Sequence, residues 1–173
     1  PASYKDAVAE ALRLMENAGY CTPRKKKDCK KLADIEVQYN TNELHKSILL
    51  VAQQMWKKIG VAVTPVNKEW KVYLSDKKQG NFVMSRAGWI GDYLDPVAFL
   101  GIFTTGNGNN DSNWSNAKFD ELLAAAANES DEKKRMANLA AAEKILLAEM
   151  PIIPVFSYST SYLMKPEVGG LYP

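Results

Sequence analysis

The segment RAGWIGDYLDP, residues 86–96, concentrates side chains that could bind or transform a ligand. Arg86 can pair with a carboxylate, and Asp92 can pair with an ammonium group. Asp92 and Asp95 could also act as the two carboxylates of a glycoside hydrolase, but their separation along the chain is short for that chemistry. Asp95 stands directly before Pro96, where a helix N-cap and first helical residue are expected. A cap therefore explains Asp95, and Arg86 and Asp92 remain as ligand candidates.

Three further side chains could contact a ligand. His45 is the only histidine, and it falls in the first turn of a predicted helix, where free backbone amides favour an anion; a surface polar residue is the alternative. Lys77 ends another predicted helix, where a solvated cation is also favoured. Trp89 follows a predicted strand beside two glycines and could line a cavity. No nucleophile is paired with His45 in a known motif, so we expect no enzyme.

The elements that would position these groups alternate along the chain. Apolar periodicity predicts helices over 4–19, 41–60, 68–80, 95–104, 117–130 and 131–150, strands over 34–40, 61–67 and 82–89, and a strand or hairpin pair over 151–166. The helix over 41–60 carries one apolar stripe that includes Leu44, Val51 and Met55, and Asn40 or Thr41 is its expected cap. This alternation favours an α/β domain, in which ligands bind near strand ends and helix starts.

Composition excludes several classes of protein. The chain has 173 residues, 46% of them hydrophobic, and a net charge of +2, so no strong field for nucleic acid is expected. The most basic stretch, PRKKKDCKK at 23–31, is interpreted as a solvated loop. No apolar run reaches the length of about 18 residues that a transmembrane helix needs.

Cys21 and Cys29 are the only cysteines, and they lie in the same basic loop. Two cysteines with one distant histidine do not form a zinc site. The residues alone leave a disulfide and two free thiols equally open.

The sequence YNTNELHKSILLVAQQMWKKIGVAVTPVNKEWKVYL, followed by QGNFVMSRAGWIGDYLDPVAFL, closely resembles the oligopeptide-binding proteins of bacterial ABC importers. TTGNGNNDSNWSN, IIPVFSY and KPEVGG extend the resemblance over nearly the whole chain. It implies a type II periplasmic-binding-protein lobe, an α/β fold with a mixed sheet flanked by helices. Residues 1–173 would then be a single domain, most of the second lobe, with the first lobe and a returning C-terminal segment outside this sequence.

The resemblance also implies roles for individual residues. Asp92 matches the acid that pairs with the α-amino group of the peptide, and Arg86 matches a base near its carboxyl end. His45 matches another polar group used there, and Trp89 matches an aromatic residue beside a side-chain pocket. Lys77 falls where many members carry arginine, which leaves its role less defined.

The partners and compartment follow from the same resemblance. We expect an oligopeptide ligand, a membrane permease of an ABC importer and the first lobe as partners, with no cofactor and no nucleic acid. The protein would be periplasmic or lipid-anchored, and an oxidising compartment favours a Cys21–Cys29 disulfide. One alternative is the same fold with another ligand, such as a murein peptide, a dipeptide, haem or a nickel chelate. A second is an exported hydrolase.

Overall fold

The computed structural model describes residues 3–159, 161 and 163–170. The chain divides into two compact units, Pro1–Leu94 and Asp95–Pro173. Each unit has its own hydrophobic cluster, and each is considered separately below.

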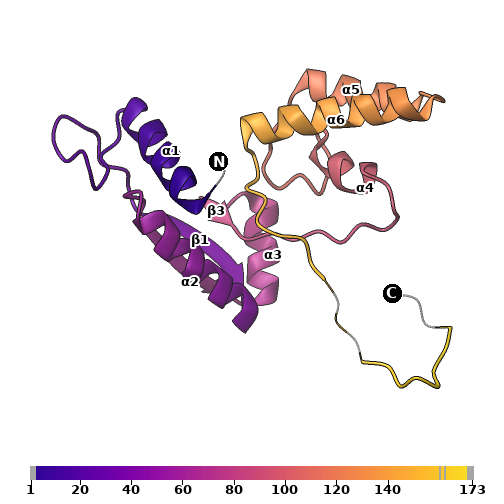
Figure 1. Cartoon of the computed structure of the whole chain (residues 1–173), viewed down its shortest axis with the longest axis horizontal. Coiled ribbons are helices and arrows are strands. Elements are labelled where there is room, and N and C mark those ends of the chain that lie inside the picture. The colour runs from indigo at the N-terminus through magenta and orange to yellow at the C-terminus, as the bar shows by residue number, and fades with distance from the viewer. Residues whose placement is uncertain (1–2, 160, 162, 171–173) are drawn as a thin grey trace. The chain divides into compact units, whose positions relative to one another are not determined.

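The first unit alternates helices and strands. Its elements are α1 (Tyr4–Asn17), β1 (Ile35–Asn40), α2 (Glu43–Lys57), β2 (Val63–Lys68), α3 (Trp70–Gln79) and β3 (Met84–Ser85) (Figure 1). The strands form one sheet in the order β2-β1-β3. Both described pairings are parallel, with Val37 of β1 opposite Pro65 of β2 and Met84 of β3. The sheet is therefore parallel where a mixed sheet was expected, because a helical crossover lies between each strand and the next.

The middle of β1, Val37–Tyr39, is buried on both faces. Val37 and Tyr39 pack with Leu49 of α2 and Val63 of β2 in one cluster. Side chains alternate along a strand, so Gln38 points to the opposite face. It is also buried, and its Nε2 donates a hydrogen bond of 3.2 Å to Ser85 Oγ of β3. A central strand covered on both sides fixes where its carboxyl end lies.

Caps start α2 and α3 close to the strand ends. The side chain of Asn42 accepts hydrogen bonds from the backbone amides of Leu44 and His45, at 2.9 and 3.1 Å. The carboxylate of Glu69 accepts from the amides of Lys71 and Val72 in the same way. Asn42 is thus the cap of α2, and the expectation of Asn40 or Thr41 was wrong by two and one residues, respectively.

The second unit is helical in its described part. It contains α4 (Val97–Leu100), the 3-10 helix η1 (Gly101–Phe103), α5 (Ala117–Ala127) and α6 (Glu132–Glu149). Its buried cluster consists of Leu100, Phe119, Leu123, Ala126, Leu139, Ala142 and Leu146. These side chains come from α4, α5 and α6, so the three helices share one core.

Asp95 caps α4, as the sequence predicts, although the geometry differs by one residue. Its Oδ1 accepts a hydrogen bond of 2.9 Å from the backbone amide of Val97, and Pro96 stands at the N-cap position. The carboxylate also pairs with Arg135 of α6 at 2.8 Å, and this hydrogen-bonded partner lowers the pKa of Asp95. Asp95 therefore has a structural role that links two helices.

Two predicted strands differ in the structure. The strand expected over 82–89 is reduced to Met84–Ser85, and the described residues of 151–166 contain no strand. Val155 and Phe156 in that segment are exposed. An alternating apolar pattern is not sufficient for a strand, because its backbone amides and carbonyls also need a partner strand. Among the described helices, none combines the length and apolar character needed to span a membrane.

Leu139 provides a test of the core of the second unit. It is 1% exposed, so Leu139→Ala leaves a cavity and should lower the free energy of unfolding by about 3 kcal/mol. Leu147 of the same helix is 41% exposed, and Leu147→Ala should cost less than about 1 kcal/mol. Urea denaturation followed by circular dichroism measures both. Equal losses in the two variants would contradict the assignment of this core.

Candidate functional site

The strand order creates a position where ligands bind in open α/β sheets. From β1 the chain continues to β2 on one side, and β3 then lies on the other side of β1. In parallel sheets of this order, ligands bind outside the carboxyl ends of the two strands at which the connections diverge. Here those strands are β1 and β3. The residues that follow them are the first to consider as ligand contacts.

Asn40 and His45 lie together at the end of β1. Asn40 is the last residue of that strand, and His45 is in the first turn of α2. His45 Nδ1 lies 2.9 Å from Asn40 Oδ1. An amide oxygen accepts hydrogen bonds, so Nδ1 carries the proton and the Nε2 of a neutral ring remains an acceptor. Asn40 thus orients the ring of His45.

Arg86 lies at the end of β3, and its backbone is held from two sides. Its amide donates a hydrogen bond of 2.8 Å to the carbonyl of Gln38 in β1. Its carbonyl accepts a hydrogen bond from the hydroxyl of Tyr73, a buried residue of α3. The root of the guanidinium side chain is therefore fixed by both the sheet and a helix.

The charges of Arg86 and His45 influence each other. The pKa of His45 is lowered, first by burial and then by the positive charge of Arg86, while a hydrogen bond with the backbone of Asn40 opposes this shift. Burial also lowers the pKa of Arg86, although a guanidinium keeps its charge at neutral pH. The edge of the sheet therefore holds one fixed cation beside a neutral imidazole. Such a pair favours an anionic group of a ligand.

Lys77 is connected to this group through Tyr73. Its Nζ lies 5.5 Å from the centroid of the Tyr73 ring, within the range of a cation–π contact. Tyr73 is the same residue that holds the carbonyl of Arg86. His45 and Arg86 thus lie at the carboxyl ends of β1 and β3, whereas Lys77 lies in the last turn of α3 and contacts the ring of Tyr73.

Asp92 and Trp89 lie on the irregular segment that follows β3. Both side chains are exposed, Trp89 at 37%. They are close to Arg86 along the chain and lie outside the helices and strands. Contact of Asp92 and Trp89 with a ligand stays a prediction.

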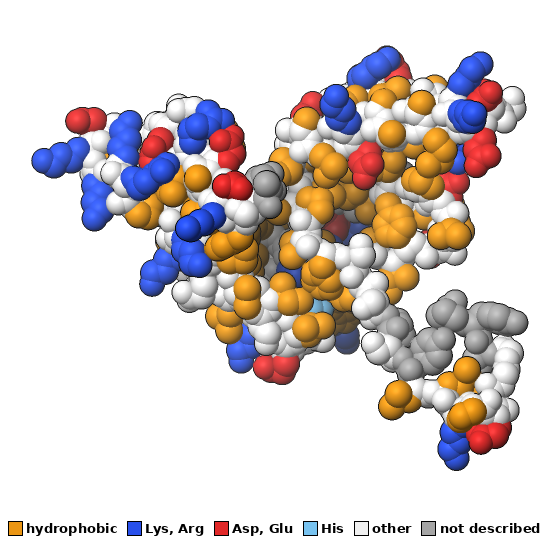
Figure 2. Space-filling view, in the orientation of Figure 1, with side chains coloured by type: hydrophobic (Ala, Val, Ile, Leu, Met, Phe, Trp, Pro, Cys, Tyr) orange, Lys and Arg blue, Asp and Glu red, His pale blue; other side chains and the backbone are white. Residues whose placement is uncertain are grey.

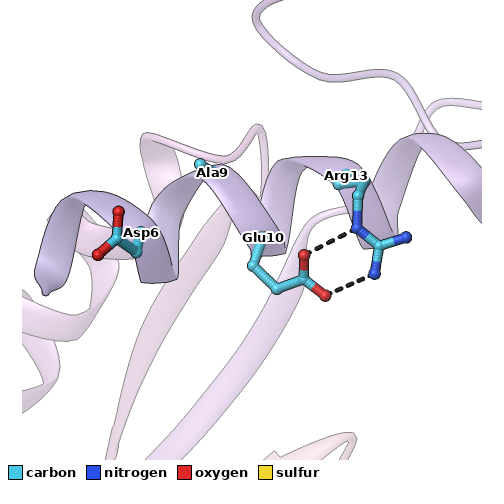
Figure 3. A pocket seen from close by; sticks show the side chains of 4 residues that line it. All are labelled: Asp6, Ala9, Glu10 and Arg13. Carbon is cyan, nitrogen blue, oxygen red and sulfur yellow. Dashed lines mark hydrogen bonds and ion pairs between the residues drawn. The ribbon is translucent and has the colours of Figure 1, made fainter. Parts of the chain in front are cut away.

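A surface depression on α1 is a weaker candidate site. It is lined by Asp6, Ala9, Glu10 and Arg13, all from one helix (Figure 3). Arg13 donates two hydrogen bonds to the Glu10 carboxylate, at 2.7 and 2.6 Å, and the bond lowers the pKa of Glu10. These charges satisfy each other, and the depression contains none of the predicted ligand residues. The end of the sheet is the better candidate on chemical grounds.

The structure also adds residues that the sequence did not indicate as part of the site. Asn40 orients His45, Tyr73 holds Arg86, and Gln38 accepts from the amide of Arg86 through its carbonyl. A signal for Asn40 was present, because it is the polar residue that ends the predicted strand directly before a predicted helix. Tyr73 and Gln38 gave no such signal, since their roles depend on contacts between elements distant in sequence.

The single histidine allows a direct test of this geometry. Because the pKa of His45 is lowered from the usual 6.5, the folded state loses stability as the pH falls from that value through the folded pKa. Arg86→Gln removes the neighbouring charge and should raise the pKa of His45. Asn40→Ala removes the side-chain hydrogen bond to His45 Nδ1 but keeps the backbone of residue 40, whose hydrogen bond opposes the shift, so it should change the pKa of His45 less than Arg86→Gln does. NMR titration of the only imidazole measures both.

Lys144→Gln is the matched control for loss of a positive charge, because Lys144 is exposed on α6. It should leave the titration of His45 unchanged. If Arg86→Gln also leaves the titration unchanged, the two groups are not coupled.

The sequence is similar to known proteins over most of its length. Residues 1–111 match the family described as bacterial extracellular solute-binding proteins, family 5, middle. The chain is 38% identical over 172 residues to the periplasmic murein peptide-binding protein MppA of Escherichia coli strain K12, covering 99% of this chain and 30% of MppA. It is 40% identical over 168 residues to the dipeptide-binding protein DppE of Bacillus subtilis strain 168, covering 96% of this chain and 30% of DppE.

A solved structure shows the same fold. Haemophilus influenzae OppA in complex with RPPGFSPFR superposes with a TM-score of 0.77 at 32% identity, covering 87% of this chain and 29% of that chain. The chain thus spans about 30% of the length of the curated relatives that it matches. The family match over residues 1–111 and these similarities show that the chain belongs to the bacterial extracellular solute-binding proteins of family 5.

Proposed function

We propose that this chain forms most of the second lobe of a two-lobed solute-binding protein, which captures peptides and delivers them to the membrane permease of an ABC importer. The observation that carries the proposal is the placement of Arg86 beside a neutral His45 at the carboxyl ends of β1 and β3. Both compact units would belong to that lobe.

The chemistry of the site suits a peptide. Arg86 can pair with a carboxylate, and the neutral His45 can take part through its second ring nitrogen. Asp92 is an exposed acid close to Arg86 in sequence, and it would pair with the α-amino group. Carboxylate and ammonium are present in every unmodified peptide, so these contacts would be independent of the peptide's sequence.

The names of the relatives support a peptide ligand without specifying its size. They describe a murein peptide-binding protein, a dipeptide-binding protein and oligopeptide-binding proteins. Several of these relatives are periplasmic, and a location in the cell envelope is proposed here as well. The Cys21–Cys29 disulfide fits such an oxidising compartment. Attachment through a lipid is a further part of the proposal.

The isolated chain of 173 residues provides a test of the two-lobe arrangement. If the ligand is enclosed between two lobes, this chain supplies only one wall of the site and leaves the ligand charges in water. Short unmodified peptides should then bind no tighter than about 1 mM, or about −4 kcal/mol, in isothermal titration calorimetry. Micromolar binding would show that the site is complete within this chain and would overturn the two-lobe arrangement.

The roles of Asp92 and Asp95 can be distinguished in a protein that carries both lobes. Asp92→Ala leaves the ligand ammonium unpaired and should weaken binding of unmodified peptides by about a hundredfold. Asp95→Ala is the matched control, because Asp95 already caps α4 and pairs with Arg135. It should lower the melting temperature and leave the affinity nearly unchanged.

N-acetylated peptides complete this test. They lack the ammonium group, so wild type should bind them poorly, and Asp92→Ala should cause little additional loss. Equal affinity of wild type for free and acetylated peptides would exclude Asp92 as the amine anchor.

A further inference from the structure

The loop between α1 and β1 carries a concentrated positive charge that the proposed peptide site does not use. Within 23–31 there are six cations, Arg24, Lys25, Lys26, Lys27, Lys30 and Lys31, and one acid, Asp28. The net charge of this stretch is +5, whereas the whole chain carries only +2. All six cations are exposed, and Figure 2 shows Lys and Arg side chains gathered over this part of the first unit. We call residues 20–31 the basic loop.

The basic loop is closed at its base. Cys21 and Cys29 form a disulfide with a Cα–Cα distance of 5.0 Å. The amide of Cys21 donates a hydrogen bond of 3.0 Å to the carbonyl of Lys30, and the amide of Lys30 donates one of 2.8 Å to the carbonyl of Gly19. Within the loop, Thr22 and Lys25 exchange backbone hydrogen bonds of 2.9 and 3.2 Å. These contacts restrict the conformations available to the loop.

The loop is also seated on the turn that follows α2. Gly60 has a φ of +88°, and a Cβ there would lie 3.2 Å from the carbonyl oxygen of Cys21 and 3.2 Å from Pro23 Cδ. Thr22 is buried, and its hydroxyl donates a hydrogen bond of 2.7 Å to Glu16 of α1. The base of the basic loop is therefore fixed to two elements of the first unit.

The charge at the tip of the loop is not neutralised within the described residues. Glu16 pairs with Arg24 at 3.3 Å and interacts electrostatically with Lys25, whereas no ion pair joins a described acid to Lys26 or Lys27. Like charges held in a short, closed loop repel one another, and this repulsion opposes folding. An external anionic surface would offset it. The disulfide and the backbone hydrogen bonds of the loop keep the lysines together in the absence of such a surface.

We propose that the basic loop is a docking surface for a membrane of anionic phospholipids. Clusters of four to eight Lys and Arg residues bind such surfaces, with a contribution from each cation. Lysine side chains are long and mobile, which suits a diffuse layer of phosphates better than a single acidic protein. The inference goes beyond the proposed function and rests on it only for the presence of a membrane, since delivery to a permease takes place there.

Vesicle binding tests the proposal. The chain should bind vesicles of equal parts phosphatidylglycerol and phosphatidylcholine, and it should not bind pure phosphatidylcholine vesicles. The triple variant Lys25→Gln, Lys26→Gln, Lys27→Gln should lower the partition coefficient by about a hundredfold. Added salt should weaken binding of wild type, because it screens exposed charges beyond about 10 Å at 0.1 M. Sedimentation with the vesicles measures the bound fraction.

A control triple variant removes the same charge elsewhere. Lys5→Gln, Lys71→Gln, Lys144→Gln changes three exposed lysines outside the basic loop and should alter partitioning by less than about threefold. Equal losses in the two triple variants would show an effect of net charge alone and overturn the docking surface. Absence of binding by wild type to the anionic vesicles would overturn it as well.

Two further variants separate vesicle binding by the basic loop from the fold and from peptide binding. Cys21→Ser with Cys29→Ser should bind the anionic vesicles more weakly than wild type while circular dichroism shows that the fold is retained. In a protein with both lobes, the basic-loop triple variant should bind peptide with the affinity of wild type. Failure of vesicle binding with intact peptide binding would reject the docking surface alone, and the reverse would reject only the proposed function.

Discussion

The parallel pairing of β1 with both of its neighbours is the constraint on which the first unit depends. A strand paired on both edges and covered on both faces must bury its polar groups, and Gln38 shows how this is done through a hydrogen bond to Ser85 of β3. The pairing also places the carboxyl ends of the three strands at one edge, where α2 and α3 begin. The site follows from that arrangement, because Asn40 ends β1 and Arg86 follows β3.

The electrostatics of the site depend on the same arrangement. His45 and Arg86 are far apart in sequence, and only the β1–β3 pairing brings them close enough for the charge of Arg86 to lower the pKa of His45. Burial has the larger effect on that pKa, so the imidazole would stay largely neutral even without its neighbour. An anionic ligand at this position would lie beside the guanidinium of Arg86, which stays charged, and the imidazole of His45, which can take up a proton. Binding of a carboxylate should therefore favour proton uptake by His45.

Local patterns predicted most elements of the fold but not their partners. The helices over 4–19, 41–60 and 68–80 were right to within three residues at each end, because periodicity and capping are local signals. The α2 stripe was less accurate: Leu49, outside the stripe, is the buried residue, whereas Leu44, Val51 and Met55 are 43–61% exposed. An apolar stripe shows that a face is suited to burial without identifying what covers it. The parallel sheet, the short β3 and the missing strand in 151–166 all depend on pairing, which no local pattern encodes.

In the candidate site as well, local sequence patterns predicted some residues, whereas others depend on contacts between elements that are distant in sequence. Arg86, His45 and Lys77 were predicted as ligand residues from residue type and from the resemblance to peptide-binding proteins, and this role stays a prediction. The structure places Arg86 and His45 at the carboxyl ends of β3 and β1. Asn40 was taken as a cap of α2, but Asn42 performs that role, and Asn40 is thereby available to hold His45. The contact between Asn40 and His45 thus depends on Asn42, rather than Asn40, being the cap of α2. Asn42→Ala would remove that cap from the amides of Leu44 and His45, so it should lower the stability of α2 at the turn that carries the imidazole.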